Sequence, residues 1–208
     1  MDFTKHSEGK QIQASPQTHR VRIIFEQLSV TACSTTERQF QAFVERLSDA
    51  LLGLSKTSLN PKEASLSFNA RNLLKDNRND FFSLALSKLE QYLKHEIDVI
   101  FKPKEKENLS ESDLSLISFE EMEKQLLLSS ISRAIELQHT DQLTTLSSRL
   151  THLVDSSGFP ASSNPFRPRT FISAINDAWC EFSTDNNSHQ MVLPLLKPNV
   201  FIDFAPVL

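Results

Sequence analysis

The chain contains three glycines in 208 residues, whereas an average content of about 7% would give roughly fifteen. Glycine supplies the positive φ angles that tight β-hairpin turns need, and it lets phosphate-binding loops approach a ligand closely. All-β folds, Rossmann units and P-loops are therefore disfavoured together. The shortage favours an all-α protein and removes most enzyme classes that carry a recognisable sequence signature.

The charged residues argue against two classes of partner. The 22 Lys and Arg residues stand against 26 Asp and Glu residues, giving a formal net charge of -4, and the two signs are interspersed. Without a basic stripe we expect no nucleic-acid binding. The sequence also lacks a long apolar run and an apolar N-terminal core, so we expect no membrane insertion, no signal peptide and a cytoplasmic location.

Apolar residues recur at three-to-four spacing through the first half of the chain, which is typical of amphipathic helices. The polar residues 1–19 before them are predicted to form a disordered arm. A break is expected at Ser34–Thr36, and Asn60 with Pro61 is expected to begin a new helix. The helices of this half are thus predicted from residue 20 to the break, at 37–54, at 60–74 and at 82–100.

A charged stretch separates this half from the rest of the chain. Residues 102–113 contain almost no apolar side chains, so they are predicted to be an exposed linker. The linker divides the chain into an N-terminal helical half, residues 20–101, and a C-terminal helical half, residues 114–208.

The C-terminal half opens with a capping box, because Ser118 is followed three residues later by Glu121. A periodic apolar run follows and meets no Gly or Pro until Gly158. We predict one long helix of roughly 40 residues, unbroken or gently kinked, with two helices joined near residues 138–141 as the alternative. Together with further helices at 169–182, 186–196 and 199–204, this predicts an irregular bundle of about seven to eight helices.

The three glycines fall at different kinds of position. Gly9 lies in the predicted arm, and Gly158 stands where a helix C-cap is expected. Gly53 instead falls inside the predicted helix 37–54, where no turn requires it. We therefore expect another helix to cross closely at Gly53.

No segment carries a complete catalytic or metal-binding pattern. His95 is followed by Glu96, but position 99 is Val99, where the zinc-protease pattern needs a second histidine. Cys33 and Cys180 have no assignable histidine base and are interpreted as ordinary reduced thiols. We expect no catalytic residue, no metal site and no cofactor, and a helical enzyme with a site built from scattered polar residues stays as an alternative.

The proline-rich connector before the helix at 169–182 is the most distinctive segment. Arg167 and Arg169 stand at a helix entry beside free backbone amides, where they could bind a phosphate or a partner carboxylate. In the competing interpretation Phe166 fills the core, Asn164 and the prolines set the turn, and the arginines are solvated. The candidate partner or anion contacts are Asn164, Phe166, Arg167 and Arg169.

Several short motifs resemble a bacterial family of unknown function, whose members are large, mostly helical proteins often mislabelled as thymidine phosphorylase. The resemblance spans roughly residues 20–208 and implies a helical scaffold in a bacterial cell, with no catalytic residue to carry over. Some relatives continue into a C-terminal region that resembles cyclic-di-GMP-binding PilZ domains, but this chain shows no PilZ-like arginine motif. The motifs that carry the resemblance are Leu114–Ile117, Glu120–Glu123, Leu150–Val154, Asn164–Pro165, Phe81–Phe101 and Phe201–Pro206.

These observations predict a non-catalytic helical module for protein–protein interaction or regulation. Its two halves would pack together and present a groove or a helix face to a protein partner, with a homodimer among the options. The alternative is an adaptor, chaperone or small effector associated with a bacterial secretion system.

Overall fold

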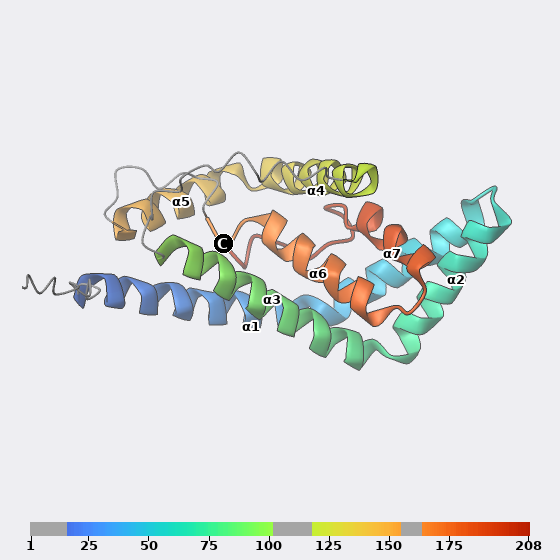
Figure 1. The fold of residues 1–208 in the computed structure, drawn as a ribbon, viewed down its shortest axis with the longest axis horizontal. Coiled ribbons are helices and arrows are strands. Elements are labelled where there is room, and N and C mark those ends of the chain that lie inside the picture. Colours follow the sequence, from blue (N-terminus) through green and yellow to red (C-terminus); the bar gives the residue numbers. More distant parts are fainter. Residues whose placement is uncertain (1–15, 102–117, 155–163) are drawn as a thin grey trace, which may run out of the picture.

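A computed structural model describes residues 16–101, 118–154 and 164–208 (Figure 1). Within these ranges the chain forms seven α-helices and no strand, so the predicted all-α fold is confirmed. The elements are α1 (Pro16–Thr57), α2 (Pro61–Asp76), α3 (Arg78–Phe101), α4 (Phe119–Gln138), α5 (Thr140–Val154), α6 (Pro168–Phe182), α7 (Asn186–Val192) and the 3₁₀ helix η2 (Leu193–Leu195).

Helix α1 is one helix of 42 residues, so the predicted break at Ser34–Thr36 is wrong. The hydroxyls at the expected break bond within the helix: Thr35 Oγ1 donates to the Thr31 carbonyl (2.9 Å) and Thr36 Oγ1 to the Ala32 carbonyl (2.9 Å). Such bonds satisfy the side chain without breaking the backbone ladder. Residues 16–19, placed in the disordered arm by the sequence, are its first turn, and residues 1–15 lie outside the described residues.

Helices α1 and α3 lie antiparallel side by side, with α2 at the turn between them (Figure 1). The predicted start of α2 is confirmed, because Asn60 Oδ1 accepts from the Lys62 amide (3.0 Å) and Pro61 occupies the first turn. Helix α6 packs along α3, and α4 covers another side of α6. In this arrangement α6 is the central helix of the second half.

Aromatic side chains from both halves form one core around α6. The Trp179 ring lies 5.9 Å from that of Phe81, and its Nε1 donates to the Ser188 carbonyl (3.0 Å). Phe171 meets Phe204 with ring centroids 4.9 Å apart. The halves 20–101 and 114–208 therefore share a single hydrophobic interior, while the predicted linker, residues 102–113, lies outside the described residues.

The long helix predicted after residue 118 is two helices, as in the alternative that the sequence left open. Its predicted cap is confirmed, since Ser118 Oγ accepts from the Glu121 amide (3.2 Å). At the other end His139 leaves the helical conformation (φ -122°, ψ 27°), and Thr140 Oγ1 donates a hydrogen bond to the Glu136 carbonyl (3.1 Å). The chain then restarts as α5.

Two other predicted helices are shorter or absent. The helix expected at 186–196 ends as α7 at Val192 and tightens into η2, whose Pro194 cannot donate a backbone hydrogen bond. The helix expected at 199–204 is a series of turns. There Arg46 of α1 donates to the carbonyls of Val200 (2.9 Å) and Phe201 (2.7 Å), so these carbonyls do not serve a helix.

The close crossing predicted at Gly53 is also wrong. The residue is exposed, and a Cβ atom added there would meet nothing within 4 Å. Gly158 lies outside the described residues, so its predicted role as a cap stays a prediction.

Candidate interaction surface

Two of the four residues predicted in the connector are buried. Asn164 Oδ1 accepts from the Phe166 amide (2.9 Å), while its Nδ2 donates to Ser147 Oγ of α5 (3.2 Å). Phe166 stacks on Phe25 of α1, with ring centroids 6.5 Å apart. These two side chains face inward and fasten the entry of α6 to α5 and α1.

The two arginines of the connector reach neighbouring helices. Arg169 donates through Nη1 to Ser129 Oγ (2.8 Å) and through Nη2 to Gln125 Oε1, both on α4. Arg167 Nη2 lies 3.9 Å from Glu96 Oε2 on α3. Arg169 therefore links α6 to α4 through neutral groups, and the binding of an anion by either arginine stays a prediction.

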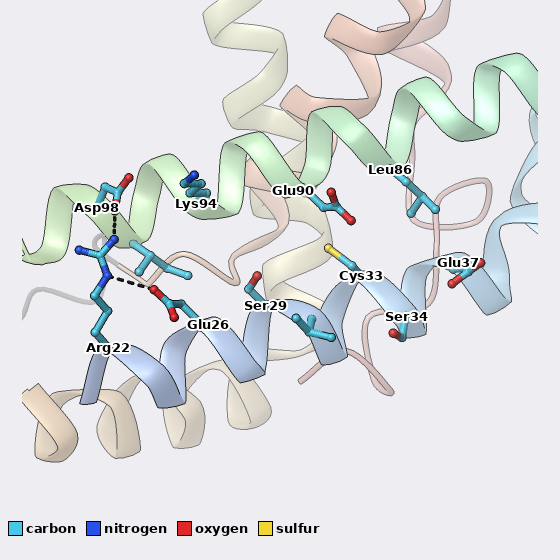
Figure 2. Close-up of a pocket in the computed structure, with 12 residues that line it drawn as sticks. Arg22, Glu26, Ser29, Cys33, Ser34, Glu37, Leu86, Glu90, Lys94 and Asp98 are labelled. Atoms are coloured by element: carbon cyan, nitrogen blue, oxygen red, sulfur yellow. Dashed lines mark hydrogen bonds and ion pairs between the residues drawn. The ribbon is translucent and has the colours of Figure 1, made fainter. Parts of the chain in front are cut away.

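A groove of about 580 Å³ runs between α1 and α3 (Figure 2). At one end Arg22 pairs with Glu26 of the same helix (3.0 Å) and with Asp98 of α3 (2.6 Å). Further along, Cys33 and Glu90 face each other across the gap. The Arg22–Asp98 pair thus links the two helices at this end of the groove.

Both cysteine thiols are poorly suited to nucleophilic chemistry. Burial and the nearby Glu90 carboxylate raise the pKa of Cys33 to about 11. Burial also raises the pKa of Cys180, with Lys124 opposing the shift in part. Because the thiolate is the reactive form, both residues hold little of it at neutral pH.

Polar contacts also attach the first turns of α4 to the rest of the bundle. Asp177 of α6 accepts a hydrogen bond from the Tyr92 hydroxyl of α3, and Lys124 Nζ of α4 lies 3.4 Å from the same carboxylate. Burial and the Asp177 carboxylate raise the pKa of Tyr92, which therefore stays a protonated donor. Together with the contacts of Arg169, the Tyr92–Asp177–Lys124 cluster attaches α4 to α6.

The outward side of α4 carries four large apolar residues that the described chain does not cover. Their exposed fractions are 72% for Phe119, 49% for Met122, 66% for Leu126 and 70% for Leu137. Their spacing places them on one side of the helix, opposite the buried side formed by residues such as Leu128 and Ile135. We call this surface the α4 outer face.

Three adjoining hollows of about 380, 600 and 360 Å³ run beside α4, between it and the segment after α6. The first two share Leu127 and Pro194, and the last two share Gln138 and Pro198. The middle hollow is mainly lined by apolar and small side chains. Helix α4 contacts η2, and the hollows lie along the edges of this contact.

The sequence analysis predicted the periodic apolar run of α4 but did not identify the α4 outer face. A signal was present, because Leu126, Leu127 and Leu128 are consecutive and three consecutive helical residues cannot all point to one side. In the structure only Leu128 is buried, while Leu127 is half-buried and Leu126 is exposed.

The described ranges show neither a membrane-spanning helix nor a cluster of metal ligands. No helix there has both the length and the apolar content that crossing a bilayer requires. No three of their His, Cys, Asp or Glu side chains gather where they could hold a metal ion.

Comparison with known proteins identifies one family. A family model described as the N-terminal domain of a protein of unknown function, DUF1631, matches residues 20–208. No curated protein and no solved structure matches the chain.

Proposed function

Since the chain belongs to the DUF1631 family, whose function is unknown, we propose from its own geometry that it is a non-catalytic interaction module. In this proposal it binds a protein partner through α4, and it does so in the cytoplasm of a bacterial cell. The bacterial setting is supported by the resemblance of its motifs to the bacterial family described above.

The observation that carries the proposal is the α4 outer face. Exposed apolar side chains that gather on one surface commonly mark an interaction site, and Phe119, Leu126 and Leu137 are each about two-thirds exposed or more. Burying such side chains is worth on the order of 1.5–3 kcal/mol each when complete. A partner that covered this face would therefore gain several kcal/mol without any change in the fold.

The protonation and ion pairing of the ionisable groups support the non-catalytic part of the proposal. Both thiols and the Tyr92 hydroxyl are held protonated by burial. Arg22, the cation at the end of the α1–α3 groove, is occupied by Glu26 and Asp98. These are the features of groups that stabilise helix packing.

Site-directed photo-crosslinking in the source cell tests the proposal. A photoreactive amino acid at Met122, on the α4 outer face, should give an adduct of defined mass that is identified by mass spectrometry. The matched control places the same group at Leu59, a fully exposed apolar residue between α1 and α2. Leu126→Gln, which puts a polar group beside Met122, should abolish the adduct.

Two results would refute this function. One is equal labelling from Met122 and Leu59, because the α4 outer face would then bind no specific partner. The other is an adduct from Met122 that survives Leu126→Gln, because binding would not depend on the apolar face.

A further inference from the structure

The pattern of side chains along α4 is self-complementary, and we infer that the α4 outer face pairs with the same face of a second copy of the chain, in antiparallel orientation about a twofold axis. This inference rests on the proposed function, since it names the partner of the same surface. It assigns to the pair a register centred near Leu128.

The apolar ends of the α4 outer face define this register. Turning one helix end for end about the level of Leu128 brings Phe119 of one copy to the level of Leu137 of the other. Both residues are about 70% exposed, so each apolar end covers its counterpart. The twofold axis makes this contact occur twice.

The residues between these ends fit the same register. Met122 then lies at the level of Ala134, and Leu126 at the level of Ser130, so that each large side chain lies at the level of a small one. Alternation of large and small residues lets two helices approach closely with interdigitated side chains. Ser130 and Ala134 are exposed, and both line the edge of the middle hollow, whose opposite wall is formed by Pro194 and residues 197–199.

The charges of α4 favour a second copy in this orientation over other arrangements. The register places Glu123 of one copy at the level of Arg133 of the other, twice over. Both side chains are exposed and neither makes a hydrogen bond or ion pair with another residue in the described part of the chain. A parallel pair would instead bring Glu123 beside Glu123 and Arg133 beside Arg133, which is unfavourable.

The length of α4 limits the area that the proposed helix pair can bury. A helix of 20 residues is about 30 Å long, so one helix pair forms an interface at the small end of the range for specific complexes. We therefore expect a reversible dimer with a dissociation constant on the order of micromolar.

Sedimentation equilibrium of the full chain, from about 1 to about 300 μM, tests the inference. Glu123→Arg should weaken the dimer about tenfold or more, because two attractive pairs become two repulsive ones, and Arg133→Glu should do the same. The double variant with both changes should restore the dimer. Arg38→Glu, an exposed charge reversal on α1, is the control and should leave the equilibrium unchanged.

Four outcomes would overturn the inference. A chain that stays monomeric over the whole range excludes the pair, and so does a dimer that neither single reversal weakens. A dimer that the double variant fails to restore excludes the antiparallel register. If the chain is monomeric while photo-crosslinking at Met122 captures another protein through Leu126, the proposed function stands and only this inference fails; capture of residues 102–117 of the same chain would refute both.

Discussion

Helices α6 and α4 both carry large apolar residues on more than one side, but they differ in what covers them. Nine residues of α6 are buried, and α3, α4 and α7 surround it. Helix α4 buries four residues, and its outward side lies open. The apolar content of a helix therefore indicates that it needs covering, and the packing of the chain decides whether the covering is internal.

The two helices are also held differently. Trp179 and Phe171 anchor α6 through aromatic contacts in the core. Helix α4 is attached partly by polar groups at its side, namely Arg169 and the Lys124–Asp177 pair. We therefore assign the stability of the bundle chiefly to α6, and under our proposal α4 provides the binding surface.

The largest expected effect is the loss of an aromatic side chain from α6. Phe171→Ala should lower the free energy of unfolding by about 3–5 kcal/mol, because it leaves a cavity beside Phe204. Urea unfolding followed by the fluorescence of Trp179, the single tryptophan, measures the change. Phe119→Ala on α4, at low protein concentration, is the control and should change the free energy by less than about 0.5 kcal/mol. Equal losses for the two variants would remove the distinction between the helices.

The second expected effect concerns the buried thiol of Cys33, which lies between α1 and α3. The pKa of Cys33 is about 11 in the folded chain, against an ordinary value of 9.0. Above pH 9 the unfolded chain therefore loses this proton first, and stability should fall by up to roughly 2–3 kcal/mol between pH 9 and 11. The loss is measured by urea unfolding, as the difference between the wild type and Cys33→Ala. A difference that does not change with pH would mean that solvent reaches the thiol.

The helical fold was predictable from the sequence because local chemistry determines it. Asn60 and Ser118 each cap a helix where the sequence places them. The errors fall where a local preference competes with contacts that are distant in sequence. A break was predicted at Ser34–Thr36, but Thr35 and Thr36 bond within α1, and the helix packs on α3 without interruption.

The candidate site was harder to predict, because a periodic pattern does not state which neighbour covers a face. Arg167 and Arg169 were singled out as ligand contacts, and the structure shows them reaching α3 and α4. The exposure of Leu126 depends on where α6 leaves α4 uncovered, which is a property of the assembled bundle. Only the run of three consecutive leucines indicated it in advance.

The third prediction concerns the exposed side of α1 at Gly53, which carries no large apolar residue at that position. Gly53→Ala in α1 should raise the free energy of unfolding by about 0.5–1 kcal/mol, because Ala favours the helix and nothing lies within 4 Å of the new methyl group. Thermal or urea unfolding measures the gain. Destabilisation would mean that a group packs against α1 at this point, so that its outer side is covered as α6 is.

The smallest expected effect is at the centre of the α4 outer face. Leu126→Gln should change the free energy of unfolding by less than about 0.5 kcal/mol when the protein is dilute, because Leu126 is exposed and Gln is also a good helix former. Ile135→Gln, on the buried side of the same helix, should cost about 2 kcal/mol or more, because it places an amide in an apolar environment. Urea unfolding at submicromolar concentration compares the two variants. If Leu126→Gln costs as much as Ile135→Gln under these conditions, the chain itself covers this face, and the contrast between α4 and α6 disappears. If it is neutral when dilute and destabilising only at high concentration, the stability of α4 is linked by mass action to the partner that covers it.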